Sequence, residues 1–261
     1  MTIRLPSIAT LVTGLAGLAI LAAPAARAEA AELAVLSAGA MKTIVTELAE
    51  AFRQETGHTV RITAGTVGVV RQKAAAGEPA DVLVLSDVAV DDLIVQQLIV
   101  PGTRVDLART GIGVGVKEGA PKPDISTPEA LKQTLLAAKS FVYLDPAQGA
   151  TSGIHFASVL QRLGIADAVK DKAILWPGGF AAEAVLKGQA ELVVHQISEI
   201  LPVKGVTLVG PLPKEVQKIT TYSAGLGVRS ATPDLARTFI AYLARPAFRE
   251  KFAAAGLDYK E

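Results

Sequence analysis

Residues 33–41 read Leu-Ala-Val-Leu-Ser-Ala-Gly-Ala-Met, an apolar run that passes through small residues into a helical pattern. Two later stretches, Thr63–Gly68 and Gly149–Gly153, repeat this arrangement. The first turn of a helix carries backbone N–H groups without internal partners, and small side chains let a ligand approach them closely. Three such helix starts facing one cleft would form an anion site without a cationic side chain.

Apolar β-rich runs alternate with helical patterns along most of the chain. We predict strands at residues 33–36, 60–63, 82–85, 112–116, 141–144, 192–194, 206–209 and 226–228. We predict helices at residues 41–55, 69–76, 88–98, 128–139, 154–163, 181–187 and 233–243. Most strands are continuous apolar runs, so the alternation predicts an α/β fold with mostly parallel sheets flanked by helices. Ligands of such sheets bind beyond the carboxyl ends of the strands, where the small-residue junctions fall.

The N-terminus is typical of a secretory signal peptide. Arg4 precedes an apolar stretch from Ile8 to Ala23, and Ala26-Arg27-Ala28 matches the small-residue cleavage pattern. We therefore predict a cleaved signal peptide over residues 1–28 and a soluble mature chain in the periplasm. An uncleaved membrane anchor is the less favoured alternative, because the apolar stretch is short and rich in Ala and Gly.

Composition argues against several classes of function. The sequence has no cysteine, which excludes disulfides, thiolate metal sites, cysteine nucleophiles and a lipid-bearing cysteine at the cleavage site. Its 26 Lys and Arg nearly balance 25 Asp and Glu without a basic block, so we expect no nucleic-acid and no membrane partner. Aromatic residues make up only 5% of the chain, which disfavours a sugar stacked on aromatic rings.

No motif in the sequence calls for a cofactor or a metal cation. Gly111-Ile-Gly-Val-Gly115 lacks the spacing of a dinucleotide loop and no helix follows it, so we expect a tightly packed strand there. The three histidines are far apart and have no metal-ligand spacing. Asp81 and Asp87 flank a predicted strand and are expected as helix caps or first-turn charges.

Catalysis has one candidate, a serine hydrolase that uses Ser152 with His155. Both residues fall in the first turn of one predicted helix, whereas a catalytic triad gathers its base from elsewhere in the fold. A helix cap at Thr151 or Ser152 is favoured, and we expect no enzyme activity. The pair His195-Gln196 ends a predicted strand. These side chains either find hydrogen-bond partners at the edge of the core or contact the cleft.

Four strings carry a resemblance to a known family: Leu36–Lys42, Ala76-Gly-Glu-Pro-Ala-Asp81, Val84–Asp87 and Thr151–His155. With an exported, cysteine-free α/β chain, they resemble the periplasmic molybdate-binding proteins of ABC importers. The resemblance implies a two-lobed type II periplasmic binding protein with two hinge crossings, which closes on its ligand. We place lobe 1 at residues 29–112 and 219–261, and lobe 2 at residues 113–218.

The same resemblance implies where the ligand is held, by hydroxyls and backbone N–H groups without a cation. A helix-start serine of the family falls at Ala40 and a second-loop serine at Val67. A third contact falls at Ser152, a backbone donor at Gly178 or Gly179, and the family's tyrosine at Gln196. The full candidate set is Gly39, Ala40, Met41, Thr66, Val67, Gly68, Ser152, Gly153, Gly178, Gly179 and Gln196.

Three of these positions depart from the family pattern, namely Ala40, Val67 and Gln196. Each side-chain donor lost from a desolvated oxyanion costs about 1.5–3 kcal/mol, and about 1.4 kcal/mol is a tenfold change in affinity. The resemblance implies a monomeric receptor that passes a small anion to an ABC transporter permease, and a binding protein that acts as a sensor without a permease is the alternative. Two ligand classes stay open, a molybdate- or tungstate-type oxyanion and a small organic acid.

Overall fold

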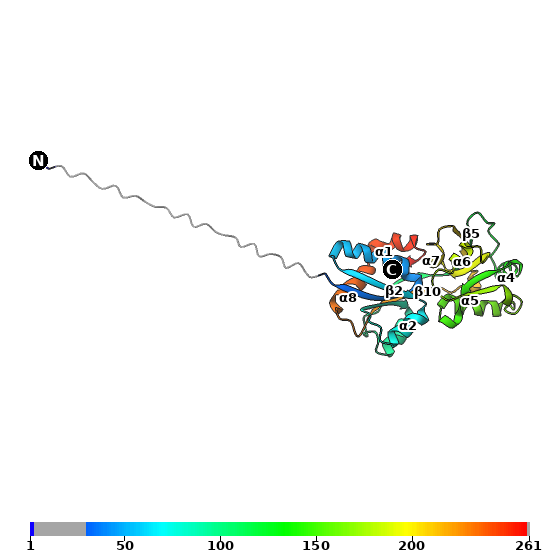
Figure 1. The fold of residues 1–261 in the computed structure, drawn as a ribbon, viewed down its shortest axis with the longest axis horizontal. Helices are drawn as coiled ribbons and strands as arrows, with labels where there is room; N and C mark the ends of the chain where they lie inside the picture. Colours follow the sequence, from blue (N-terminus) through cyan, green and yellow to red (C-terminus); the bar gives the residue numbers. More distant parts are fainter. Residues whose placement is uncertain (3–29, 260–261) are drawn as a thin grey trace.

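The computed structural model describes residues 1–2 and 30–259. The predicted signal peptide and its cleavage site lie outside these residues, apart from Met1 and Thr2. The described chain forms two lobes side by side, each built around its own mixed β-sheet with helices packed against it (Figure 1). Within the described part, no helix combines the length and the apolar character needed to cross a membrane.

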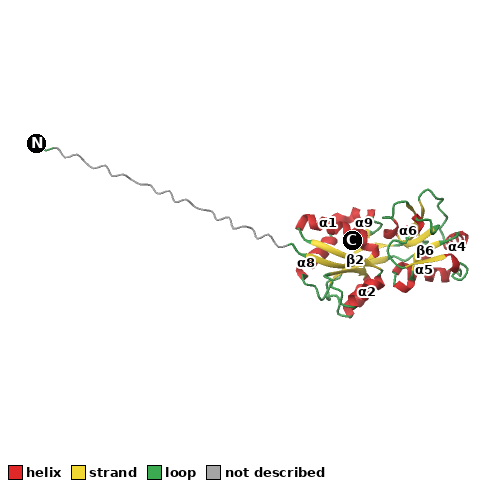
Figure 2. Cartoon of the chain, viewed as in Figure 1, coloured by secondary structure: helices red, strands yellow, loops and turns green. Residues whose placement is uncertain are grey.

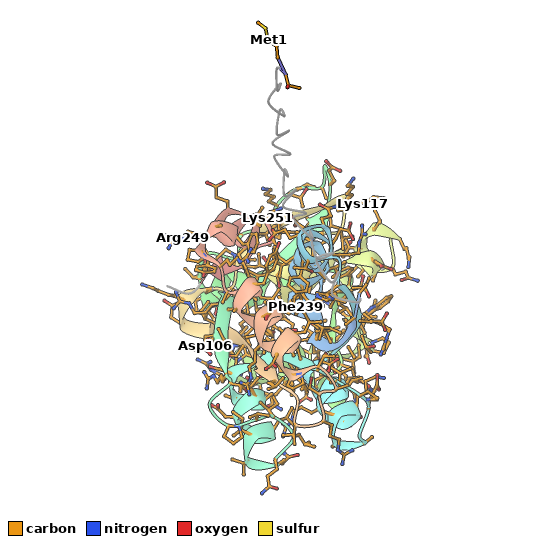
Figure 3. All side chains as sticks on the ribbon, turned by 90° about the vertical axis from the view of Figure 1, so that its left-hand side faces the viewer. Met1, Asp106, Lys117, Phe239, Arg249 and Lys251 are labelled. Carbon is orange, nitrogen blue, oxygen red and sulfur yellow. The ribbon has the colours of Figure 1, made fainter. Side chains whose placement is uncertain are left out.

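The first lobe combines the start and the end of the described chain. Its strands are β1 (Glu32–Ala38), β2 (Thr59–Gly65), β3 (Val82–Ser86), β4 (Val105–Thr110), β10 (Thr220–Leu226) and β11 (Asp258–Tyr259). They form one sheet in the order β11-β4-β10-β3-β1-β2. Its helices are α1 (Gly39–Thr56), α2 (Val67–Ala75), α3 (Asp87–Val95), α8 (Pro233–Leu243) and α9 (Arg249–Ala254). Figure 3 looks onto this lobe, where Phe239 of α8 is fully buried.

The second lobe takes the middle of the chain. Its strands are β5 (Ile112–Lys117), β6 (Phe141–Leu144), β7 (Ala173–Trp176), β8 (Leu192–Gln196) and β9 (Val206–Pro211), in the order β7-β6-β8-β5-β9. Its helices are α4 (Pro128–Ala137), α5 (Thr151–Arg162), α6 (Ala182–Leu186) and α7 (Ile197–Ile200). Two separate apolar clusters form its core, and Figure 2 shows helices on both sides of the strands.

Local sequence explains the best-defined helices. In α1, Ile44, Leu48 and Phe52 recur every fourth residue and are all buried, as an amphipathic helix requires. Gly57 ends this helix with a φ of 79°, in the left-handed region that favours glycine. Helix α4 starts where Thr127 accepts a hydrogen bond from the Ala130 N–H and Pro128 occupies the first turn.

The α/β architecture is confirmed, but the sheets are mixed, which corrects the prediction of mostly parallel sheets. Within residues 30–259, four strand pairings are parallel and five are antiparallel. Four of the antiparallel pairings involve β5 or β10, each of which enters its sheet from the other lobe, and the fifth joins β11 to β4. The strand predicted at residues 226–228 was misplaced, since the polar run Thr220–Ser223 forms most of β10.

The predicted strand over Gly111–Gly115 is present as β5. A Cβ added at Gly113 would lie 2.9 Å from the Gly210 carbonyl oxygen, and one at Gly115 would lie 2.9 Å from the Val193 side chain. Strands β8 and β9 therefore approach this strand more closely than side chains would allow. The glycines serve packing, as expected from the absence of a nucleotide-loop spacing.

Two crossings join the lobes, from β4 to β5 and from β9 to β10. Gln217 lies on the second crossing and binds the first crossing through two hydrogen bonds to Ile112. Its Oε1 accepts from the Ile112 N–H at 2.9 Å, and its Nε2 donates to the Ile112 carbonyl at 2.8 Å. The two crossings are thus tied at one point, which suits a hinge. Ile112 already pairs in the second sheet, and the lobe boundaries at 112–113 and 218–219 stay a prediction.

Asp81 joins segments of the first lobe that are far apart in sequence, so its expected role as a helix cap was wrong. Its buried carboxylate accepts from the Ala34 N–H at 2.8 Å, the Ser230 hydroxyl at 2.6 Å and the Ala231 N–H at 3.1 Å. These bonds tie β1 to the loop that follows β10. Removing the carboxylate leaves the donors without their partner.

We predict that Asp81→Ala lowers the free energy of unfolding by about 3 kcal/mol, because two or more charge-assisted hydrogen bonds are lost in a buried setting. Asp92→Ala is the matched control. Asp92 pairs with Arg71 at 3.0 Å but is 46% exposed, so its loss costs less than about 1 kcal/mol. Urea unfolding followed by circular dichroism measures both. Equal effects of the two substitutions would contradict this role for Asp81.

Candidate functional site

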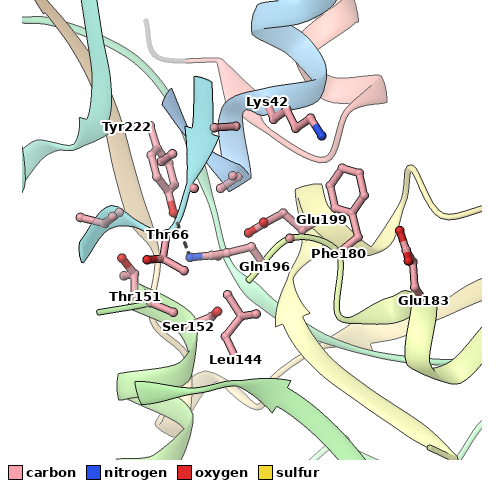
Figure 4. Close-up of a pocket in the computed structure, with 18 residues that line it drawn as sticks. Lys42, Thr66, Leu144, Thr151, Ser152, Phe180, Glu183, Gln196, Glu199 and Tyr222 are labelled. Atoms are coloured by element: carbon pink, nitrogen blue, oxygen red, sulfur yellow. Dashed lines mark hydrogen bonds between the residues drawn. The ribbon is translucent and has the colours of Figure 1, made fainter. Parts of the chain in front are cut away.

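A cavity of about 180 Å³ lies between the lobes, at the carboxyl ends of β1, β2 and β8. Helices α1 and α2 of the first lobe and α5 of the second begin at its wall (Figure 4). The first turn of a helix carries N–H groups without partners inside the helix, although in α2 the N–H groups of Gly68 and Val69 are bonded to the Gly149 carbonyl and the Thr66 hydroxyl. The lining includes Ala38, Gly39, Ala40, Lys42, Thr66, Val67, Leu144, Thr151, Ser152, Gly179, Phe180, Gln196, Glu199 and Tyr222.

Two buried side-chain atoms of the wall lack a hydrogen-bond partner among the described residues. They are the Ser152 hydroxyl and the Oε1 oxygen of Gln196. The Nε2 of Gln196 donates to the Tyr222 hydroxyl at 3.2 Å, across the lobe boundary (Figure 4). Because an unpaired buried polar group is costly, these two atoms mark places where a ligand would complete the hydrogen bonding.

The wall also carries apolar groups. Leu144, Val67 and Ala40 line the cavity, and the half-buried Phe180 ring stands near its mouth. Lys42 holds its ammonium 5.4 Å from the centre of this ring and is exposed. The cavity therefore offers neutral donors, a carbon-lined surface and one nearby cation.

Two carboxyl groups line the cavity, those of the half-exposed Glu183 and the buried Glu199, and neither had been predicted there. Glu199 on α7 is 4% exposed and points toward Gln196 and Tyr222 (Figure 4). Its Oε2 lies 3.3 Å from Nδ1 of His195. Its Oε1 sits against the start of α1, where a Cβ added at Gly39 would lie 2.5 Å away. Gly39 thus leaves space for a carboxyl that comes from the other lobe.

Burial determines the charge of Glu199 and His195. Desolvation raises the pKa of Glu199 to about 8, opposed by the charge of Lys42. Desolvation lowers the pKa of His195 to about 4, opposed by its hydrogen bond with the Gly179 carbonyl. At neutral pH the pair is therefore uncharged for the most part. A protonated carboxyl can donate a hydrogen bond to an anion that a carboxylate would repel.

We predict that Glu199 makes the free energy of unfolding fall with rising pH between about 4.5 and 8. Its folded-state pKa is raised from 4.5 to about 8, so the unfolded chain loses the proton first and stability falls until pH passes 8. His195 acts in the opposite direction between about pH 4 and 6.5, because its pKa is lowered on folding, so the slope from Glu199 is measured above 6.5.

Urea unfolding at pH 6.5, 7.25 and 8 tests this slope. The wild type should lose up to about 1.4 kcal/mol per pH unit relative to Glu199→Gln. Glu50→Gln is the control, since Glu50 lies outside the cavity, is half exposed and pairs with Arg53 at 2.6 Å. Parallel pH curves for the wild type and Glu199→Gln would show that Glu199 titrates normally.

Direct backbone contacts hold the lobes together beside the cavity. The Gly68 N–H donates to the Gly149 carbonyl at 3.1 Å, and the Thr66 hydroxyl donates to the Gln148 carbonyl. Gly149 has a φ of 65° and lies so close that its added Cβ would be 2.6 Å from the Gly68 Cα. Glycine is therefore needed on both sides of this contact for the lobes to close.

We predict that Gly68→Ala keeps the lobes apart, because its Cβ would lie 2.7 Å from the Gln148 carbonyl oxygen. Small-angle scattering in the presence of ligand should give a larger radius of gyration than for the wild type, and affinity should fall at least tenfold. Gly210→Ala is the control, since its Cβ meets only the Ile125 side chain at 3.9 Å. If the Gly68→Ala protein is as compact as the wild type, the contact between Gly68 and Gly149 is not needed for the lobes to close.

The structure brings most of the candidate ligand residues to the cavity. Those on its wall are Gly39, Ala40, Thr66, Val67, Ser152, Gly179 and Gln196. The Thr66 hydroxyl is occupied, because it also accepts from the Val69 N–H as the cap of α2. Whether any of these residues binds a ligand stays a prediction.

Four of the candidate residues lie off the wall. Met41 is fully buried in the core of the first lobe, and Gly68 serves the lobe contact. Gly153 lets α5 pack on β6, since its added Cβ would lie 2.1 Å from the Leu144 carbonyl oxygen. Gly178 does not line the cavity, whereas its neighbour Gly179 does.

The arrangement does not support a serine hydrolase. No base in the described chain hydrogen-bonds the Ser152 hydroxyl, and the ring of His155 instead contacts the Val216 carbonyl at 2.8 Å. The sequence left the roles of His195 and Gln196 undecided. In the structure Gln196 lines the cavity, and His195 lies behind it and is fully buried. In residues 30–259, no cluster of three or more histidine or carboxylate side chains is arranged to hold a metal ion.

Two lobes joined by two crossings, with helix starts facing the cavity between them, define a bilobal solute-binding protein. A model of the family described as bacterial extracellular solute-binding protein matches residues 33–258. The chain belongs to this family. The fold is that of type II periplasmic binding proteins.

A curated protein, the aconitate isomerase of a Pseudomonas species, is 35% identical over 216 residues, covering 80% of this chain and 81% of that protein. Among solved structures, the Azotobacter vinelandii periplasmic molybdate-binding protein matches with a TM-score of 0.74 at 21% identity, over 88% of this chain and 100% of the other. Campylobacter jejuni PEB3 bound to L-phospholactate matches with a TM-score of 0.65 at 17% identity, over 87% and 99%. At these identities the structures share the fold with this chain.

Proposed function

We propose that the protein captures a small organic acid with more than one carboxylate in the cavity between its lobes and delivers it to an ABC transporter permease. The observation that carries this proposal is the mixed wall of the cavity. Neutral donors at three helix starts suit carboxylate groups, and the apolar side chains between them suit a carbon skeleton.

A bare tetrahedral oxyanion fits this wall less well. Such an ion needs donors on every side, because each of its oxygens loses water on binding. Here Ala40, Val67 and Leu144 supply carbon atoms where an oxyanion needs donors. A carbon skeleton with carboxylates at its ends meets both kinds of surface.

The similar proteins also support an organic acid as the ligand. The protein that is 35% identical over most of its length carries the name of an enzyme that acts on aconitate, an unsaturated tricarboxylic acid. The molybdate-binding structure is only 21% identical, so its ligand has less weight. The two isomers of aconitate are therefore the first probes to use for this chain.

Lys42 and Glu199 give the cavity a polarity that suits such an acid. Lys42 stands exposed beside the Phe180 ring, where it can attract a carboxylate at the mouth. Glu199 is buried deeper and, as the neutral acid, can donate to another carboxylate. Closure at Gly68 and Gly149 then shields the ligand from water.

We predict micromolar or tighter binding of cis- or trans-aconitate by isothermal titration calorimetry, with molybdate, tungstate and sulfate at least 100-fold weaker. Ser152→Ala should weaken binding of the acid about 10- to 100-fold, because one hydrogen bond to a charged group is worth about 1.5–3 kcal/mol. Ser158→Ala on the same helix is the control, since its hydroxyl donates to the His155 carbonyl outside the cavity. Micromolar molybdate binding with no binding of either acid would overturn the proposal.

A further inference from the structure

The cavity contains one group that simple capture of an anion does not need. An acidic side chain inside an anion site opposes binding whenever it is ionised, and a glutamine would donate equally well at any pH. Glu199 nevertheless reaches across the lobe boundary into the site. Apart from the approach of His195, no hydrogen bond or ion pair engages its carboxyl within the described chain.

We propose that Glu199 exchanges a proton with a carbon atom of the bound acid, so that the protein shifts the double bond of an unsaturated acid as well as holding it. This inference rests on the proposed function, since it requires a small organic acid in the cavity. It adds a reaction, proton transfer at carbon, to a site otherwise built for binding.

The surroundings of the carboxyl suit a group that both takes and returns a proton. Burial favours the neutral acid, whereas the ammonium of Lys42 and the positive start of α1 at Gly39 favour the carboxylate. The two influences leave the pKa of Glu199 near 8. General acid–base catalysis works best when the pKa of the group lies near the working pH.

His195 positions the carboxyl when Glu199 is protonated, because the ring nitrogen that faces it can only accept a hydrogen bond. Its Nε2 lies 3.2 Å from the Gly179 carbonyl and its Nδ1 accepts from the Gln196 N–H at 2.7 Å, so the ring donates through Nε2 and faces Glu199 with Nδ1. Oε2 of the carboxyl is thereby directed to the ring, and Oε1 is left at the start of α1, on the wall of the cavity. His195 is a positioning residue in this scheme.

The reaction needs no co-reactant. The Glu199 carboxylate removes a proton from a CH₂ group that lies between a carboxylate and the C=C bond of the acid. The C–H electron pair forms a new C=C bond, and the electrons of the old one pass toward the neighbouring carboxylate. The Glu199 carboxylic acid then returns the proton to the far carbon of the former double bond. One C–H bond breaks and one forms, so substrate and product are isomers.

The same neutral donors that bind the acid stabilise its intermediate. Negative charge grows on a substrate carboxylate as the proton leaves, and the starts of α1 and α5 line the same cavity, where the N-terminal end of a helix favours negative charge. The unpartnered Ser152 hydroxyl and the Gln196 side chain lie on the same wall. These groups are already in place before the charge appears, which is the condition for electrostatic stabilisation.

Proton NMR in D₂O with the full mature protein and trans-aconitate tests the proposal. The wild type should replace protons of the bound acid with deuterium and form the other isomer. Glu199→Gln should slow both about 100-fold or more, the usual contribution of a general base, while calorimetry shows binding within tenfold of the wild type. Glu50→Gln, at a residue outside the cavity that pairs with Arg53 at 2.6 Å, should keep the wild-type rate.

The pH profile separates a catalytic role from a structural one. Below pH 8 the exchange rate of the saturated protein should rise about tenfold per pH unit as Glu199 ionises, then level off. His195, Lys42 and Tyr222 face the carboxyl, and burial raises the pKa of Tyr222 beyond this range while His195 titrates below it. Glu199→Asp should keep a measurable rate with the same profile shape.

The possible outcomes distinguish a failure of this inference from a failure of the proposed function. Binding of the acid without exchange or isomerisation in the wild type overturns this inference and leaves the proposed function intact. No binding of either isomer overturns both. Full exchange by Glu199→Gln shows that another group carries the proton and removes Glu199 from this role.

Discussion

Backbone N–H groups that lack partners inside their own helix, at the starts of α1, α2 and α5, impose the main constraint on this structure. Each helix follows the carboxyl end of a strand, and three such ends meet at one cavity. The N–H groups can face a ligand only if the junction residues are small. The runs of Ser, Ala, Gly and Thr at these junctions satisfy that requirement.

The second constraint is that the cavity is divided between two lobes. Contacts of Gly68 with Gly149 and of Gln196 with Tyr222 cross the boundary, while Gln217 ties the two crossings. Closure thus brings together donors that neither lobe holds alone. A binding protein built this way gains affinity from each lobe contact and releases its ligand when they part.

Local patterns predicted much of the fold. Helix α8 was predicted with its observed ends, and α1 and α4 within two residues, because caps and apolar periodicity mark them clearly. Strand β10 was misplaced because Thr220, Thr221 and Ser223 are polar, although tertiary packing buries two of them. The direction of the strands was also missed. A strand that crosses from the other lobe and pairs antiparallel has no distinguishing local sequence pattern.

Residues close together in the chain were enough to predict the chemistry of the three helix starts, the class of solute-binding proteins and most of the elements. The wall of the cavity depends instead on packing between distant segments. Glu199 lies in an ordinary apolar stretch, Ile197–Ile200, and nothing local distinguishes it from a solvated glutamate. Its burial, its approach to His195 and its position against Gly39 arise from packing between lobes, and that packing sets its charge.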